Sequence, residues 1–184
     1  MADAEAAAGR LIEALGALPQ ILAASPERID AVAHDDRVVD AVAAFRGAMM
    51  HVLRMRMEER PLLPTSSAVR DYLKLQMATR TAEEVRVLYL TGRNDLIRDE
   101  VLTTGTLDQA PIFAREIVHR ALDLGAANLI LAHNHPSGDA TPSAADVRLT
   151  KRLRDIALGL DLRVLDHLIV GRDGVTSMRA AGLI

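Results

Sequence analysis

The sequence contains no cysteine, and this absence excludes three kinds of chemistry. Without thiols there is no disulfide scaffold, no thiolate nucleophile, and no sulfur ligand for a metal ion or an iron–sulfur cluster. Any metal ion bound by this chain must therefore be held by nitrogen and oxygen atoms, which draws attention to its 6 histidines.

Aromatic residues are also scarce, with 2 Phe, 2 Tyr and no Trp in 184 residues. Proteins that bind single-stranded nucleic acid by base stacking need clusters of them. The charge also argues against nucleic-acid binding. Residues 1–60 carry 7 Arg against 10 acids, and residues 61–184 carry 15 charges of each sign, so the whole chain has a net charge of −3. Neither part has the basic excess that phosphate binding requires, so a nucleic-acid partner is doubtful.

Long hydrophobic runs are missing as well. No segment approaches the roughly 20 apolar residues of a membrane span, and no charged-then-apolar leader opens the sequence. At 49% hydrophobic and 26% charged residues, the composition excludes disorder as the overall state. We therefore expect a soluble, cytoplasmic protein that has no membrane partner; the sequence leaves open whether it forms a homo-oligomer.

Residues 1–60 have the pattern of a small helical region. An apolar stripe with alternating spacings of four and three, from Val38 to Val52, predicts a helix over 38–55. The two prolines of the segment Glu59–Thr65 indicate a linker. We therefore predict two parts, a helical region over 1–60 and a larger domain over 61–184.

Residues 61–184 alternate between strand and helix patterns. The predicted strands cover 85–90, 96–103, 128–132, 162–170 and 175–178, and the predicted helices cover 66–77, 113–124 and 143–158. This alternation predicts an α/β domain, a mixed sheet flanked by helices.

Two histidines, His133 and His135, follow the predicted strand 128–132. Residues two apart on an extended chain point to the same side, so both imidazoles face one point. Asp146 comes eleven positions after His135, in the first turn of the next predicted helix, and the intervening loop can bring its carboxylate back to that point. Two imidazoles and one carboxylate form a three-ligand set for Zn²⁺ that leaves a position open for water, as in catalytic sites.

Hydrolysis at such a site also needs a group that handles the proton and a group that stabilises the oxyanion. Glu83 and Glu84 stand at the entry to the first predicted strand, and either could point into the site. Ser143 is placed to assist the oxyanion. These residues could instead have purely structural roles. Ser143 and Asp146 could form a helix-capping pair, and the two glutamates could be solvent-exposed residues at the entry to the strand.

The pattern H-x-H, seven residues beginning with Pro136, then S-x-x-D resembles the JAMM motif of MPN/JAB-domain zinc hydrolases. The longer segments LILAHNHPSGDATPSAADVRLTKRL and DLRVLDHLIVG are similar to sequences of the RadC family in particular. This resemblance extends from about residue 66 to 184. The resemblance implies an MPN/JAB-like fold with the layering of cytidine deaminases.

The resemblance also implies roles for individual residues. It implies a zinc site at His133, His135 and Asp146, with Ser143 assisting the oxyanion. The upstream Glu of the family motif falls on Glu83 when Leu90 is taken as the last apolar position of the first strand, with Glu84 as the alternative. His167 matches a family signature without an assigned role, and we expect it to pack near the site or to support a ligand.

The N-terminal part departs from the family pattern. RadC-like proteins usually carry a helix-hairpin-helix there, whose Gly-apolar-Gly turn lets backbone amides approach a DNA phosphate. Here residues 33–38 read AHDDRV, with no glycine and with two acids where the phosphate would approach. The resemblance therefore implies a degenerate, helix-hairpin-helix-like segment within residues 1–60, and DNA binding through it is doubtful.

Taken together, these features predict a zinc-dependent metallohydrolase of the JAMM type. It would hydrolyse peptide or isopeptide amide bonds by metal-activated water, with a protein, a peptide or a small amide conjugate as substrate. The alternative is a RadC-like DNA repair or recombination accessory protein whose metal site is structural or vestigial. A third possibility is a scaffold that has kept the fold and lost turnover.

Overall fold

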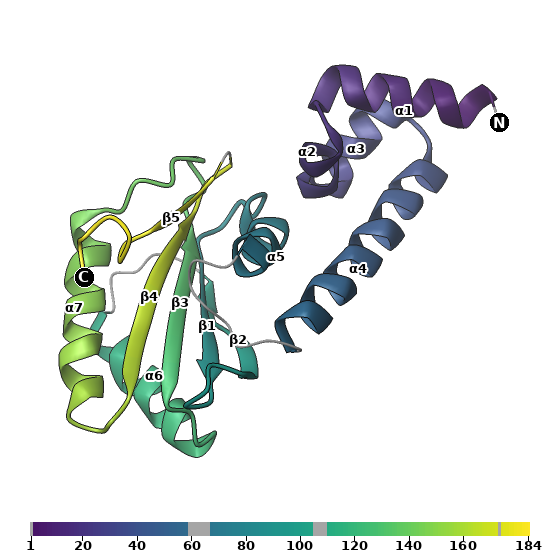
Figure 1. Ribbon diagram of the computed structural model, residues 1–184. Coiled ribbons are helices and arrows are strands. Elements are labelled where there is room, and N and C mark those ends of the chain that lie inside the picture. Colours follow the sequence, from purple (N-terminus) through teal and green to yellow (C-terminus); the bar gives the residue numbers. More distant parts are fainter. Residues whose placement is uncertain (1, 59–66, 105–109, 173) are drawn as a thin grey trace. The chain divides into compact units, whose positions relative to one another are not determined.

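The structure is a computed structural model that describes residues 2–58, 67–104, 110–172 and 174–184 (Figure 1). It forms two compact units, Met1–Arg54 and Met55–Ile184. The predicted linker, Glu59–Thr65, and the predicted boundary at residue 60 lie outside the described residues and stay predictions. No helix in the described part of the chain is both long and apolar enough to cross a membrane.

The first unit is built of helices, as predicted. They are α1 (Ala2–Leu15), α2 (Leu18–Ala23), α3 (Pro26–Ala33) and α4 (Asp36–Glu58). Their small core contains Leu11, Ile21, Ala24, Ile29 and Ala33. The Ser25 hydroxyl accepts the Arg28 N–H and caps α3, with Pro26 in the first turn.

The turn between α3 and α4 is short and strained. His34 adopts the left-handed backbone conformation, with φ of 52°, which glycine adopts more readily. The Asp35 carboxylate accepts the backbone N–H of Arg37 at 2.9 Å and pairs with its guanidinium at 2.8 Å. An amide at the start of α4 is therefore already bonded to an acid of the chain itself.

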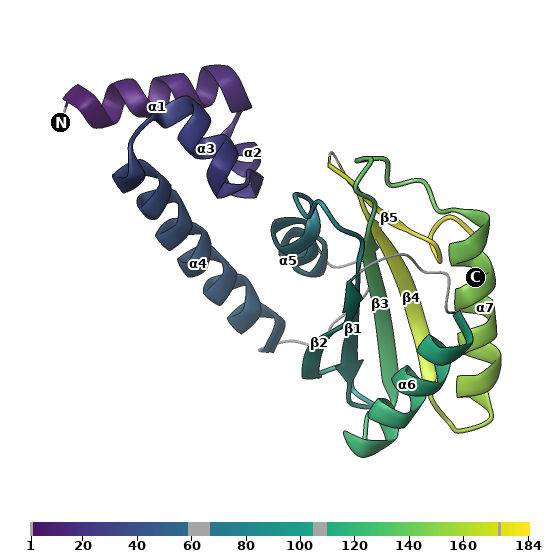
Figure 2. The same cartoon turned by 180° about the vertical axis from the view of Figure 1, so that it is seen from behind.

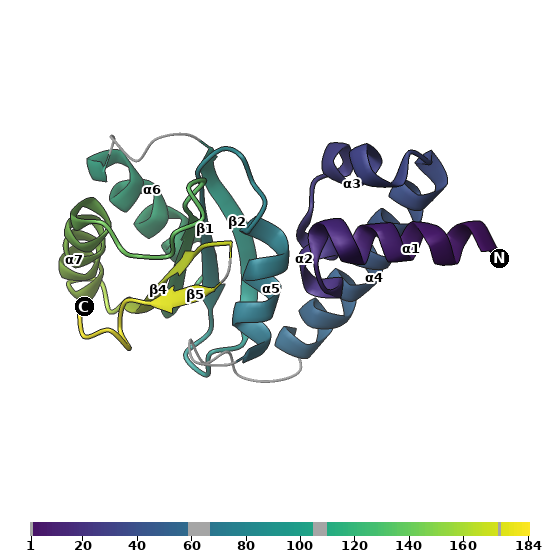
Figure 3. The same ribbon diagram turned by 90° about the horizontal axis from the view of Figure 1, so that it is seen from above.

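The second unit contains a five-stranded mixed sheet. The strands are β1 (Glu84–Leu90), β2 (Leu96–Thr104), β3 (Asn128–Asn134), β4 (Arg163–Val170) and β5 (Val175–Ser177), in the order β2-β1-β3-β4-β5. Among the strands of the described chain, only the β3–β4 pair is parallel. Helix α5 (Ser67–Met77) covers one face, and α6 (Ala110–Asp123) and α7 (Ala144–Leu158) cover the other (Figures 2 and 3). This architecture confirms the predicted α/β fold.

The central strands explain where the core lies. β1 and β3 are buried along their whole length, as their nearly continuous apolar sequences predict. Val87, Tyr89, Leu129 and Leu131 pack against α6 and α7 in one cluster. Because β3 and β4 are parallel, the chain must cross over between them, and α7 makes this crossover. The crossover returns the chain to the sheet beside the start of β3, where Arg163 lies opposite Asn128.

The opposite face of β1 carries a buried ionic network under α5. Both oxygens of Asp99 accept from Arg86 Nη1, at 2.7 and 2.8 Å, and the Tyr72 hydroxyl donates to the same carboxylate. Arg86 Nη2 also donates to Glu84 at 3.0 Å. Burial, together with the Asp99 charge, raises the pKa of Tyr72 to about 12. Glu84 thus belongs to a structural network on the α5 side of the sheet.

Candidate metal centre

Three segments bring four donor side chains together at one end of the sheet. His133 is the next-to-last residue of β3, His135 follows that strand, Asp146 lies in the first turn of α7, and Glu83 immediately precedes β1. The Nε2 atoms of the two histidines are 2.8 Å apart. Asp146 lies 3.4 Å from the Nε2 of His133 and 3.5 Å from that of His135, and Glu83 lies 4.0 Å from the former. The donor atoms of Glu83, His133 and His135 all fall within 4.8 Å of one another.

A chain of hydrogen bonds sets the proton positions on His133. The Thr150 hydroxyl donates to the Asp146 carbonyl at 2.6 Å, so it must accept from His167 Nδ1, also at 2.6 Å. Burial lowers the pKa of His167 well below its usual value, so its other nitrogen, Nε2, is a bare acceptor. His133 Nδ1 lies 2.8 Å from that acceptor and must carry the proton. The Nε2 lone pair of His133 therefore faces the site.

His135 is oriented in the same way from the other side. Its Nδ1 lies 2.8 Å from the Asp139 carbonyl oxygen, which can only accept, so Nδ1 carries a proton. Burial lowers the pKa of His133 to about 4, which keeps that ring neutral at pH 7. Two Nε2 atoms 2.8 Å apart then need a positive species between them, either a proton or a metal ion. The buried Asp146 carboxylate beside them adds negative charge, so the donor set fits a bound cation.

The two candidate glutamates lie on different sides of the sheet. Glu83 approaches the histidines, and its partial burial raises the pKa of its carboxyl group. Glu84 is buried on the α5 side, where it pairs with Arg86 at 3.0 Å and Arg80 at 3.7 Å. Of the two acids, the structure brings Glu83 to the histidines.

Asn134, between the two histidines, holds the segment that carries Glu83. Its Oδ1 accepts the Glu84 backbone N–H at 2.8 Å, and its Nδ2 donates to the carbonyls of Arg80 at 3.3 Å and Ala82 at 3.1 Å. The sequence pattern predicts no role for Asn134. Strand alternation was the one indication in the sequence, because it places the middle residue of His-Asn-His on the face of the sheet opposite the two histidines.

Ser143 and Asp146 form the capping box that their spacing allows. The Ser143 hydroxyl accepts the Asp146 N–H at 3.2 Å, and the Ser143 N–H donates to Asp146 Oδ2 at 2.6 Å. The box fixes the Asp146 carboxylate against the histidines. It uses the Ser143 oxygen only as an acceptor, so the hydroxyl proton remains free to donate.

The loop after His135 is fastened to the end of β4 by close backbone contact. A Cβ atom on Gly171 would lie 2.5 Å from the Gly138 carbonyl oxygen, so only glycine fits there. The Arg172 N–H donates to that same oxygen at 2.9 Å. This contact holds the turn that presents the Asp139 carbonyl to His135.

The sequence pattern predicts no role for Thr150, and it predicts His167 near the site without a defined role. Both are fully buried, and together they connect α7 and β4 to His133. Thr150 lies four residues after Asp146 on the same helix and therefore on the same face. That spacing was the only signal in the sequence.

The sheet, its helices and this donor cluster are those of a JAB-domain protein, and comparison with known families agrees. The family model of the RadC-like JAB domain matches residues 63–183, which include the entire site. The chain belongs to this family. It is similar to the UPF0758 protein of Rhodobacter capsulatus, with 42% identity over 183 residues, covering 99% of this chain and 86% of that protein. The resemblance inferred from the sequence is confirmed.

Proposed function

We propose that the chain is a zinc-dependent hydrolase of amide bonds that acts on peptides, isopeptides or related conjugates. The observation that carries this proposal is the pair of facing imidazole Nε2 atoms, 2.8 Å apart, beside a buried carboxylate. His133, His135 and Asp146 would hold the ion, and nitrogen and oxygen donors without sulfur suit Zn²⁺. When bound, zinc lowers the pKa of a coordinated water to about 7 and polarises a carbonyl group.

The remaining steps belong to side chains of the chain itself. Glu83 would accept a proton from the attacking water and deliver it to the leaving nitrogen, and the raised pKa of its carboxyl group suits a group that must do both. The free hydroxyl proton of Ser143 would donate to the oxyanion that develops on the substrate carbonyl.

The alternative of a DNA-repair accessory role gains no support from the first unit. A phosphate that approached the start of α4 would have to displace the Asp35 carboxylate from the Arg37 amide, which it contacts at 2.9 Å. The same carboxylate would repel the phosphate.

Metal removal and replacement test the proposal. Protein purified in metal-free buffers and then loaded is expected to carry about one zinc per chain. We expect the loaded protein to cleave members of a panel of quenched fluorescent peptides and isopeptides, to stop when zinc is chelated, and to resume when zinc is restored. Protein that takes up no zinc after addition would overturn the proposal, whereas full zinc occupancy without any cleavage would favour a scaffold.

His167 is expected to act as a positioning residue for this zinc site. Replacing it with leucine leaves the His133 Nδ1–H without its acceptor at 2.8 Å, so the ring loses its fixed orientation. Loss of such a support for a histidine ligand weakens metal binding by about 10–100-fold. A competition titration with a chromophoric zinc chelator measures the affinity.

A second variant separates positioning from packing. His167→Gln restores a side-chain acceptor and is expected to recover part of the zinc affinity that His167→Leu loses. The melting temperatures of the metal-free proteins report packing alone. Equal zinc affinity in the wild type and both variants would show that His133 is oriented by other contacts.

A further inference from the structure

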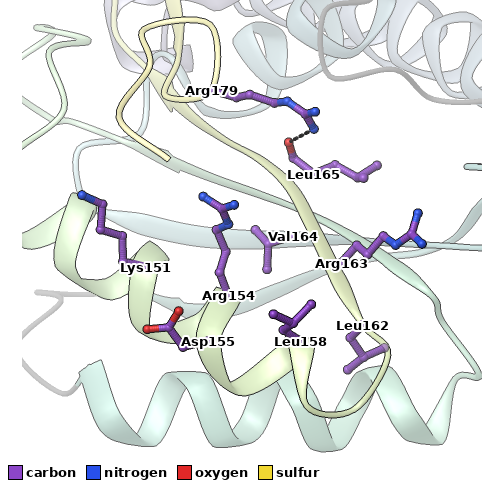
Figure 4. A pocket seen from close by; sticks show the side chains of 9 residues that line it. All are labelled: Lys151, Arg154, Asp155, Leu158, Leu162, Arg163, Val164, Leu165 and Arg179. Atoms are coloured by element: carbon purple, nitrogen blue, oxygen red, sulfur yellow. Dashed lines mark hydrogen bonds between the residues drawn. The ribbon is translucent and has the colours of Figure 1, made fainter.

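A second recess lies away from the histidines, between the later turns of α7 and the beginning of β4 (Figure 4). Its volume is about 490 Å³, within the range of ligand-binding pockets. We call it the α7–β4 cleft, and it is lined by Lys151, Arg154, Asp155, Leu158, Leu162, Arg163, Val164, Leu165 and Arg179.

The α7–β4 cleft gathers positive charge in a domain that is neutral overall. Four of its lining residues are cationic and only Asp155 is acidic. Within the described part of the chain, Lys151, Arg154 and Arg163 form no ion pair, although all three are exposed. Lys151 and Arg154 are three residues apart and so share one face of α7. Apart from Asp155, the cleft therefore presents cations that no acid of the described chain pairs with.

One wall of the cleft is an unpaired strand edge. β5 pairs only with Leu168–Val170, so in the described chain no strand covers the first half of β4 on that side. The Arg163 N–H donates to Ala127 on the β3 side at 2.9 Å, so the backbone groups of the next residue, Val164, turn to the open edge. An open edge with free N–H and C=O groups accepts an added strand.

Arg179 marks the end of this open edge. Its Nη1 donates to the Leu165 carbonyl at 3.2 Å, as Figure 4 shows, and the rest of its guanidinium group remains available to an anion. Leu158, which is 74% exposed, and Val164 add apolar surface between the cations. The cleft thus combines backbone hydrogen-bonding groups, apolar surface and positive charge.

We propose that the α7–β4 cleft binds an acidic segment of another protein in an extended conformation, as a strand added to the edge of β4. Acidic side chains of that segment pair with Lys151, Arg154 and Arg163, and its backbone bonds to Val164. A peptide fits better than a nucleic acid, because no aromatic residue lines the cleft to stack on a base. Nucleic acids also lack the backbone N–H groups that pair with a strand edge.

This binding site is separate from the zinc chemistry. Arg154 lies eight residues along α7 from Asp146, roughly 12 Å at the rise of a helix. The proposal therefore holds whether or not the chain is a hydrolase, and its test requires no turnover.

The test uses the full chain and a fluorescein-labelled octapeptide of alternating valine and glutamate. Fluorescence anisotropy measures the affinity of the peptide, of its lysine counterpart, and of a single-stranded octanucleotide. Arg154→Glu is the test variant. Arg152→Glu is its matched control, because it makes the same charge change on the exposed, roughly opposite side of α7, outside the cleft.

We expect the glutamate peptide to bind and the lysine peptide not to bind. Arg154→Glu is expected to weaken binding by about tenfold or more, whereas Arg152→Glu changes it by less than about twofold. In hydrogen-exchange NMR, the bound peptide should slow exchange of the Val164 amide. Equal losses in both variants would overturn the proposal in favour of diffuse charge attraction. An unprotected Val164 amide would exclude strand addition, and Arg154-dependent binding of the oligonucleotide alone would make this a nucleic-acid site.

Discussion

Replacing His135 with alanine is expected to lower the zinc content of the loaded protein from about one ion per chain to near zero. His135 supplies one of the two facing Nε2 atoms, and no other imidazole in the described part of the chain can replace it, because His167 Nε2 is engaged by His133 Nδ1. The domain should stay folded, since His135 lies beyond β3 and the core is made of apolar side chains such as Leu129 and Leu131. Elemental analysis measures the zinc, and circular dichroism measures the fold.

A surface histidine provides the control for this experiment. His119 lies on α6 with its side chain 78% exposed, 3.5 Å from Asp123, so His119→Ala removes an imidazole without touching the site. It is expected to keep the full zinc content. If His135→Ala unfolds in the absence of metal while the metal-free wild type stays folded, His135 supports the fold directly. If His135→Ala keeps its zinc, the ligand set is wrong.

Most elements of the larger domain could be predicted because their apolar patterns are long. The strand predicted over 128–132 ends two residues too early, since β3 continues through His133 and Asn134. These two polar residues pair with β4 like the apolar residues before them, opposite Ile169 and Val170. A hydrophobicity pattern ends at Ala132 because the next residues serve the site rather than the core.

The choice between Glu83 and Glu84 needed the register of the sheet. A shift of one residue along a strand turns every side chain to the other face, and the sequence does not set the pairing. In the structure Val85 lies opposite His133, so these two side chains share a face. Glu84 therefore turns to the α5 side and Glu83 to the side of the histidines.

Contacts between distant segments were beyond sequence reasoning. Thr150 and His167 are 17 residues apart and meet at 2.6 Å only because α7 packs along β4. The α7–β4 cleft could not be predicted from the sequence either. The 15 positive and 15 negative charges of residues 61–184 balance, so the sequence gives no sign of a basic surface. The basic cleft arises because α7 brings Lys151 and Arg154 to the start of β4, where Arg163 lies.

Replacing Glu83 with glutamine is expected to leave zinc binding intact and to reduce hydrolysis by about 10²–10⁴-fold. Glutamine has nearly the shape of glutamate but cannot accept and return a proton. The Nε2 atoms of His133 and His135 and the Asp146 carboxylate remain in place, so the zinc content should stay at about one per chain. Zinc analysis and the initial cleavage rate, measured on the same loaded sample, separate the two effects.

The neighbouring acid gives the sharpest comparison, because Glu84→Gln makes the same chemical change one residue away. Glu84 is 4% exposed and accepts from Arg86 at 3.0 Å, so loss of its charge is expected to cost about 1–3 kcal/mol of stability. The cleavage rate per zinc-loaded, folded molecule should stay close to that of the wild type. Loss of turnover in Glu84→Gln, with turnover retained in Glu83→Gln, would reverse the roles of the two acids and the register of β1 that assigns them. A large loss of zinc in Glu83→Gln would instead make Glu83 a ligand, as its position 4.0 Å from His133 Nε2 permits.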